Sequence, residues 1–356
     1  MKKIFLLIIV TLFLTGCYDN IELDDLSIVG GIGIDYVDNN YYITYEIFNN
    51  NKSDDTQNLL SYTISGFGKT LSEAFIDANY KTGKKPYFAH LKILIISESI
   101  INGHFEDITD YLFRNVEIRD EFQVLVAKNV SPKEILSKAN TRHPVISNLI
   151  NDLLNLEKYN NNLATNETFK QIIAKLTSKK TDIILNTIKI VDNNISLDNS
   201  YIFNSYSYKN ELTLEESTLY NMLTKKTINT EFTKYYGDNN LTISINSSNT
   251  DIKVTADKIK IDLKLEGRIL ENNPEFNLKD INTYKKLNND YSIVIKDSIK
   301  KFIKKLQDNN SDILGLQNIY YKKYKKDNSS LWQNADIEIN VDLKINTKGF
   351  IFEVDK

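Results

Sequence analysis

The chain has 356 residues, a length that accommodates two or three domains. Hydrophobic residues make up 41% and charged residues 26%, a globular composition that excludes a largely disordered protein. The formal net charge of −3 supplies no positive field for nucleic acid, so nucleic-acid-binding proteins are excluded. Cys17 is the only cysteine, so no intramolecular disulfide can form and burial of apolar side chains must hold the fold.

The first 16 residues have the pattern of a secretory signal peptide. Lys2 and Lys3 form a short cationic start, and residues 4–14 are apolar except for Thr11. This stretch is shorter than the ~20 residues of a membrane-spanning helix, and it has the length of the apolar region of a signal peptide. We therefore predict that residues 1–16 are a lipoprotein signal peptide.

The apolar stretch ends at Leu14-Thr15-Gly16-Cys17, which resembles the lipobox of bacterial lipoproteins. In such proteins the cysteine thiol receives a diacylglycerol, and cleavage occurs just before the cysteine. A plain signal peptide or a signal anchor, with a cysteine there by chance, is the alternative, and the single cysteine of the chain argues against it. Two acyl chains anchor a protein stably. We predict lipidation at Cys17 and attachment to the outer face of the cytoplasmic membrane.

The first half of the mature chain alternates predicted strands with predicted helices. Strands are predicted over residues 26–35, 41–48, 59–64, 91–96, 122–127 and 183–191. Helices are predicted over residues 70–80, 105–113, 144–159 and 167–176, and a further helix begins with Ser131 as its cap, Pro132 at its first position and Glu134 at its third. This alternation is typical of an α/β or α+β domain.

The pattern changes from about residue 198. Short strands are predicted over residues 241–245 and 252–254, and a cleanly alternating strand over 259–265 suits a sheet with one wet face. A long amphipathic helix follows, with an apolar stripe between Tyr291 and Leu306, and a last strand covers residues 337–345. We predict an antiparallel sheet with a long amphipathic helix.

The predicted fold is therefore a mixed α+β and α/β fold in a multi-domain extracytoplasmic protein. An N-terminal α/β domain would cover residues 17–197, and a C-terminal α+β domain would cover residues 198–356. A division of the second domain into a small middle part and a terminal part stays open.

No motif predicts catalysis, a metal site or a cofactor. Residues 66–70 resemble the end of a phosphate-binding loop, but Thr63 stands in place of its first glycine, so we interpret them as a strand-to-helix turn. His90, His104 and His143 lack the spacing of metal ligands and are interpreted as structural or surface residues.

The lysines of the long helix admit two interpretations. Lys296, Lys300, Lys301, Lys304 and Lys305 lie opposite its apolar stripe, where they could contact anionic lipid headgroups. We prefer a solvated helix surface, in which the lysine stems cover the edge of the core.

Several motifs, taken in order, resemble the C-subunit of spore germinant receptors, the Ger(x)C lipoprotein family. The segment that begins with Cys17-Tyr18-Asp19 and continues to Glu22 resembles the family's Cys-Trp-Asp-x-x-Glu opening, with tyrosine in place of the usual tryptophan. The further matching segments are residues 28–35, Gly66, 72–74, 87–92, Arg114, Glu117, Arg119, 201–203, 212–217, 312–315 and Trp332, with Ala89 where the family commonly has glycine.

The resemblance implies a non-catalytic subunit in the inner membrane of the spore. It would work with membrane-embedded A and B subunits in a complex that senses nutrients such as amino acids, sugars or nucleosides. The resemblance implies no cofactor, and we do not expect this subunit to bind small molecules alone. A solute-binding lipoprotein that captures a nutrient itself is the rival hypothesis, and a cell-wall enzyme is a third, disfavoured by the lack of a catalytic constellation.

Gly315 and Trp332 are predicted to serve the fold of the C-terminal half. Gly315 is expected in a tight turn after the long helix, in a conformation where a Cβ would clash. Trp332, the only tryptophan, is expected to cover the apolar face of the sheet.

Overall fold

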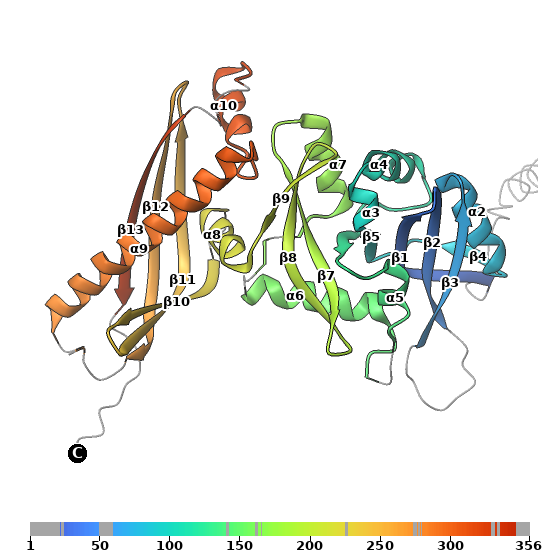
Figure 1. The fold of residues 1–356 in the computed structure, drawn as a ribbon, viewed down its shortest axis with the longest axis horizontal. Coiled ribbons are helices and arrows are strands. Elements are labelled where there is room, and N and C mark those ends of the chain that lie inside the picture. The colour runs from blue at the N-terminus through green and yellow to red at the C-terminus, as the bar shows by residue number, and fades with distance from the viewer. Residues whose placement is uncertain are drawn as a thin grey trace, which may run out of the picture.

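The computed structural model describes residues 22, 25–49, 60–139, 142–160, 163–164, 166–224, 227–272, 276, 278, 280–328, 332 and 335–346. These residues form two β-sheets that follow one another along the long axis of the molecule (Figure 1). The first sheet has nine strands and the second has four.

The nine-stranded sheet is parallel at its centre and antiparallel at both sides. Its strands are β1 (Leu26–Val37), β2 (Asn40–Asn49), β3 (Leu60–Gly68), β4 (Lys85–Tyr87), β5 (Ile93–Ser97), β6 (Gln123–Ala127), β7 (Ile183–Val191), β8 (Asn194–Asn204) and β9 (Ser207–Leu212). The strand order is β3-β2-β1-β5-β6-β7-β8-β9, and β4 pairs with the start of β1. Strands β1, β5, β6 and β7 run parallel, and each returns in the same direction after a connection that contains a helix. Tight turns connect β1 to β2 and β7 to β8, which are antiparallel.

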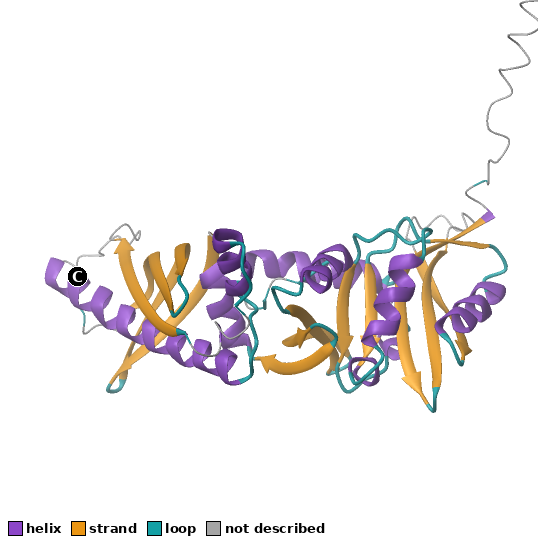
Figure 2. Ribbon diagram, turned by 90° about the horizontal axis from the view of Figure 1, so that it is seen from above, coloured by secondary structure: helices purple, strands orange, loops and turns teal. Residues whose placement is uncertain are grey.

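Helices cover both faces of this sheet, as Figure 2 shows. The helices on or around it are α2 (Leu71–Lys81), α3 (Glu98–Ile101), α4 (Phe105–Arg114), α5 (Pro132–Leu136), α6 (Ile146–Asn160) and α7 (Phe169–Ser178). Side chains of α2, α4 and α7 share one core with the sheet, and side chains of α5 and α6 share another. Ile93 and Ile95 of β5 belong to the α5–α6 core, while Leu94 and Ile96 belong to the core on the opposite face of the sheet, because successive side chains of a strand point to opposite faces. Burial on both faces explains why β5 is a continuous apolar run.

Local signals fix where two helices begin. The predicted cap at Ser131 is confirmed, because its hydroxyl accepts from the backbone N–H of Glu134 at 3.2 Å and its own N–H donates to the Glu134 carboxylate at 3.0 Å. The predicted strand-to-helix connection is confirmed in a shorter form: residues 66–68 end β3, and the turn is residues 69–70, with Thr70 as the cap of α2. At Gly66 a Cβ would lie 2.2 Å from the backbone nitrogen of Ala78, so only glycine lets β3 approach α2 this closely.

The four-stranded sheet lies against one long helix. Its strands are β10 (Thr227–Tyr236), β11 (Asn239–Val254), β12 (Lys258–Asn272) and β13 (Asp336–Asn346), and its helices are α8 (Leu214–Thr224), α9 (Ile281–Asp308) and α10 (Leu316–Tyr324). The buried stripe of α9, from Leu287 to Leu306, shares a core with the alternating apolar residues of β12. The predicted long helix and its predicted apolar side are therefore confirmed.

Three details of this sheet differ from the prediction, and the first is β10, a strand that the sequence did not predict. The short strands predicted over 241–245 and 252–254 are parts of the single strand β11, which continues through a polar stretch because its backbone pairs with β12 there. Ser248 in this stretch donates to the carbonyl of Met222 in α8. The sheet is antiparallel through β10, β11 and β12, but β13 joins β12 in parallel. The helix α9 connects β12 to β13, and a helical crossover returns the chain in the same direction.

Gly315 and Trp332 have the predicted structural roles. Gly315 has a φ of +69° at the start of α10, and a Cβ there would lie 2.9 Å from Thr181 Oγ1. Trp332 is fully buried in the core of the second sheet, and its indole Nε1 donates to the carbonyl of Leu306 at 3.3 Å.

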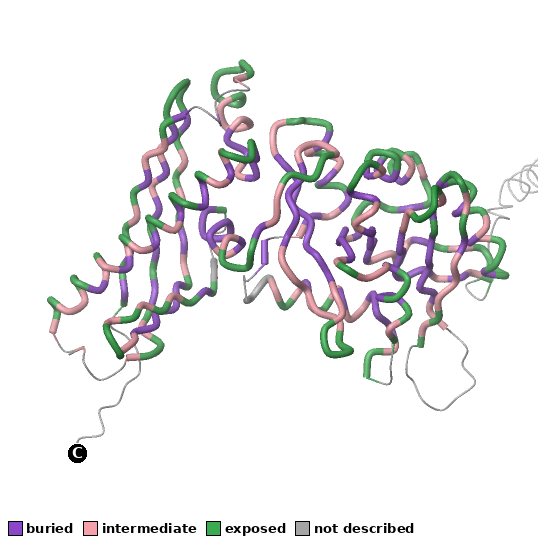
Figure 3. Tube along the Cα trace, viewed as in Figure 1, coloured by how far each residue is buried: buried purple, intermediate pink, exposed green. Residues whose placement is uncertain are grey.

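The two sheets share part of their cores. Ile184, Ile202 and Leu212 of the first sheet belong to the same apolar cluster as β11, β12 and α9. Strand β8 runs across the proposed domain boundary between residues 197 and 198. Figure 3 shows buried backbone from β7 and β8 through α8 into the second sheet, so apolar packing connects the two halves.

Candidate functional site

Cys17, the site residue that the sequence predicts, lies outside the described residues. Within the part of the chain that the structure describes, no helix is long and apolar enough to cross a membrane. The same described residues contain no group of three or more His, Cys, Asp or Glu side chains placed to hold a metal ion. The remaining candidates for a functional site are a surface cavity, an aromatic cluster beside it and a buried acidic junction.

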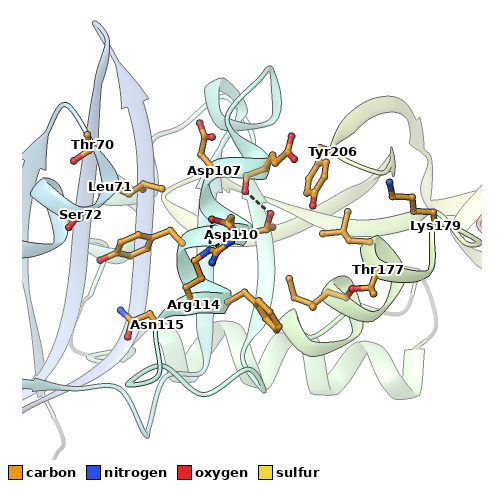
Figure 4. Close-up of a pocket in the computed structure, with 16 residues that line it drawn as sticks. Thr70, Leu71, Ser72, Asp107, Asp110, Arg114, Asn115, Thr177, Lys179 and Tyr206 are labelled. Atoms are coloured by element: carbon orange, nitrogen blue, oxygen red, sulfur yellow. Dashed lines mark hydrogen bonds and ion pairs between the residues drawn. The ribbon is translucent and has the colours of Figure 1, made fainter.

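The surface cavity lies over the outer face of α4 and has a volume of about 930 Å³ (Figure 4). Phe105, Ile108 and Leu112 turn inward to the core, so the polar positions of α4 point outward. The start of α2 forms one wall, and α7 with the β8–β9 turn forms the other. The lining residues are Thr70, Leu71, Ser72, Glu106, Asp107, Thr109, Asp110, Tyr111, Phe113, Arg114, Asn115, Ile173, Leu176, Thr177, Lys179 and Tyr206.

Two of the charged groups that line this cavity, Asp110 and Arg114, pair with each other. Arg114 Nε donates to both carboxylate oxygens of Asp110, at 2.9 and 2.8 Å. This hydrogen bond holds the pKa of Asp110 below its usual value, so the carboxylate is not poised to accept or donate a proton near neutral pH. Phe113 is 64% exposed and the Arg114 side chain 76% exposed. Since small-ligand sites bury most of their ligand, this open surface suits a docked protein segment better.

An aromatic cluster lies beside the cavity and joins the first hairpin to α4. The hydroxyl of Tyr41 lies 3.0 Å from His104 Nδ1 and donates to Asp107 Oδ2 at 3.0 Å. The ring of Tyr36 lies 3.7 Å, centroid to centroid, from the ring of His104. Burial, followed by the hydrogen bond to Asp107, raises the pKa of Tyr41. His104 therefore has partners that hold the start of α4 against the β1–β2 hairpin.

A buried acidic junction connects the two halves of the chain. Asp182 precedes β7, and Asp312 lies between α9 and α10; they are 5% and 4% exposed. The backbone N–H of Asp312 donates to Asp182 Oδ2 at 2.8 Å, and the backbone N–H of Asp182 donates to the carbonyl of Asp312 at 3.1 Å. The carboxylate of Asp312 also accepts from the backbone N–H groups of Leu316 and Gln317, and so caps α10. The junction is thus held by reciprocal hydrogen bonds.

The charges at this junction do not balance. Burial raises the pKa of Asp182 to about 6 and that of Asp312 to about 6. Burial also raises the pKa of Glu167, whose Oε1 accepts from Lys175 and from the backbone N–H of Ile184. Lys175 also donates to the carbonyl of Asp182 at 2.9 Å. Three carboxylates therefore face one ammonium group, which makes the junction sensitive to pH.

Sequence reasoning missed most of these groups. Asp312 belongs to a segment that matches the family pattern, residues 312–315, but neither Asp312 nor Asp182 carries a local signal of its own. The two aspartates are 130 positions apart, so their contact depends on the tertiary fold. The Asp110–Arg114 pair has the spacing of neighbours on one helix face and could have been read from the sequence.

Two family models match the chain in succession. The model described as Spore germination protein N-terminal domain matches residues 19–190, and the model described as Spore germination B3/GerAC like, C-terminal matches residues 198–349. Together they cover most of the chain.

Individual relatives agree with the family models. The chain is 23% identical to Spore germination protein KC of Bacillus subtilis, over 97% of this chain and 93% of that protein. It is 30% identical to Spore germination protein A3 of the same organism, over 49% of this chain and 48% of that protein. A solved structure, described as Crystal Structure of the GerBC protein, matches 92% of this chain and 99% of that chain, with a TM-score of 0.57 and 16% identity.

The structural match confirms the predicted fold class, a mixed α+β arrangement of two sheets with their helices. The names of the relatives refer to spore germination and state no reaction. With both halves matched by family models and one relative similar over almost its full length, the chain belongs to the Ger(x)C family of spore germination proteins.

Proposed function

We propose that this chain is the lipid-anchored C-subunit of a nutrient germinant receptor and that it acts by assembly, without chemistry of its own. The observation that carries the proposal is the succession of both family models over residues 19–190 and 198–349. The α4 cavity agrees with it, because Asp110 and Arg114 pair with each other there and the pair lies on an open surface. The proposed domains are residues 17–197 and 198–356, after a signal peptide of residues 1–16, and β8 crosses the boundary between them.

Lipidation at Cys17 would place the first sheet beside the membrane. An extended chain from Cys17 to Asp25 spans at most about 28 Å, and β1 begins directly after it. The protein would lie on the outer face of the cytoplasmic membrane, which becomes the inner membrane of the spore. Anchoring confines it to a thin layer beside the membrane-embedded A and B subunits and raises its effective concentration there.

The anchor is tested by labelling the protein metabolically with a fatty acid. The native chain should carry label, and Cys17→Ala should carry none, because Cys17 is the only acceptor thiol. Equal label in both proteins would contradict the anchor.

The receptor role is tested by deletion in a strain that keeps no paralogous C-subunit. Germination in response to nutrients should be delayed while vegetative growth stays normal. Calorimetry with a fragment of residues 18–356, which contains every described residue, separates assembly from solute capture. Micromolar binding of an amino acid, sugar or nucleoside would favour solute capture, and normal germination with every nutrient would contradict the receptor role.

A further inference from the structure

Six lysines gather where α7 ends beside α10. Residues 316–326 contain four lysines and no acidic residue, in a chain whose net charge is −3. Lys180, which follows α7, reaches this helix, since its Nζ lies 4.0 Å from the ring centroid of Tyr321 and pairs with Asp327. We call this group the lysine patch, and its members are Lys179, Lys180, Lys322, Lys323, Lys325 and Lys326.

Helix α10 turns one side inward and leaves its cationic side in solvent. Leu316 is fully buried, and Ile319 and Tyr320 pack against the core of the second sheet. On the outward side, Tyr321 and Tyr324 are 36% and 39% exposed, and the lysines at 322, 323, 325 and 326 are exposed. The apolar inner side holds the helix in place. On the outer side, tyrosine rings lie among lysines and form an exposed amphipathic surface.

Part of this positive charge has no carboxylate partner within the protein. Among the described residues, no acidic side chain forms an ion pair with Lys322, Lys325 or Lys326. On α9, two of the lysines are paired instead: Lys304 with Asp308 at 2.8 Å and Lys305 with Glu216 at 2.7 Å. The patch therefore keeps its charge available for an external anion.

We propose that the lysine patch binds the anionic headgroups of a lipid surface. A flat, negatively charged surface complements several exposed lysines at once, and tyrosine rings favour the boundary between headgroups and acyl chains. Figure 1 shows α10 in the C-terminal half of the molecule, far along its long axis from the end where β1 begins. Together with the proposed anchor at Cys17, the patch supplies a second attachment point, and two signals hold a protein at a membrane better than one.

The test measures binding of residues 18–356 to lipid vesicles by co-sedimentation. Vesicles of phosphatidylcholine alone are compared with vesicles that also contain phosphatidylglycerol. The protein should bind only the anionic vesicles, and added salt should weaken the binding. The triple variant Lys322→Gln, Lys325→Gln, Lys326→Gln should bind roughly 100-fold more weakly, which corresponds to about 1 kcal/mol for each lysine.

A matched control removes the same charge from α9. The triple variant Lys296→Gln, Lys300→Gln, Lys301→Gln also neutralises three exposed lysines, and it should bind anionic vesicles like the unchanged protein. Equal loss in both variants, equal binding to neutral vesicles, or no binding to anionic vesicles would each overturn the proposal. The protein could instead bind neutral vesicles only when they carry the receptor's membrane subunits, and lose this binding in the patch variant. That result would assign the patch to a protein partner and would also overturn the proposal. The vesicle measurement uses no acyl anchor, so its outcome is independent of lipidation at Cys17 and of the germination phenotype.

Discussion

The two sheets bury their strands in different ways. In the first sheet, β5 is buried along its whole length, because α2 and α4 cover one face and α5 and α6 cover the other. In the second sheet, β12 alternates, with Ile259, Ile261 and Leu263 turned to α9 and Lys264 exposed on the far face. The central strands of the first sheet thus pack between two cores, while β12 packs on one face only, in the core that its sheet shares with α8, α9 and part of the first sheet.

This difference predicts that the second half is sensitive to one large side chain. Trp332→Ala should lower the free energy of unfolding by ~3–5 kcal/mol, because the indole is fully buried and its removal leaves a cavity in the core between α9 and that sheet. Chemical denaturation measures the loss. Tyr235→Ala is the matched control: this aromatic ring of the same half is 72% exposed, and its removal should change the stability by no more than about 0.5 kcal/mol. Unchanged stability of the Trp332 variant would contradict a structural role.

The acidic junction predicts that the connection between the halves weakens as pH rises. Asp182 and Asp312 have an ordinary pKa of 3.8 and a folded pKa of about 6. A raised pKa contributes stability that is fully present below the unfolded pKa and is lost as pH rises through the folded pKa. Between pH of about 4 and about 7, each group would lose on the order of 2–3 kcal/mol, at about 1.4 kcal/mol for each pKa unit.

Asp182→Asn tests this dependence, because an amide mimics the protonated acid. Its carbonyl oxygen can still accept from the backbone N–H of Asp312, and the amide of Asn204 can turn to keep its hydrogen bond. The variant should be more stable than the native chain near pH 7, and its stability should fall less steeply with pH. Asp110→Asn is the control, since that exposed carboxylate has a lowered pKa and should not flatten the profile. A profile of the Asp182 variant parallel to that of the native chain would refute the idea.

The close contact between β3 and α2 predicts a smaller but clear cost in the first half. Gly66→Ala would place a Cβ 2.2 Å from Ala78 N and 2.5 Å from the carbonyl oxygen of Ala74, and neither backbone atom can move without shifting the helix. We expect a loss of about 1–3 kcal/mol in the free energy of unfolding. Ser72→Ala, on the exposed side of the same helix, should be nearly neutral. A Gly66 variant as stable as the native chain would show that α2 is free to move.

The sequence was informative wherever the controlling signal was local. The predicted cap at Ser131 depends on Glu134, three positions away, and the stripe of α9 repeats within one helix. Strand β10 was missed because its Thr, Asn and Lys residues leave few aliphatic positions to alternate. The parallel pairing of β13 follows from the path of α9, and the Asp182–Asp312 contact from the meeting of two distant loops. Neither of these two contacts can be predicted from a short segment of the sequence.

The smallest predicted effect concerns the cap of α5, a helix of five residues that helps to cover the second face of the first sheet. Ser131→Ala removes the hydroxyl that accepts from Glu134 N, and we expect a loss of about 1 kcal/mol in the free energy of unfolding. The loss should reach the sheet, because Ile135 and Leu136 of this helix are buried beside Ile95 of β5. Ser131→Thr keeps a side-chain acceptor and should retain most of the stability, which separates the cap from general sensitivity at this position. Hydrogen exchange at the amides of α5 would rise in the alanine variant if the cap holds the helix on the sheet, and equal exchange in all three proteins would show that packing alone holds it there.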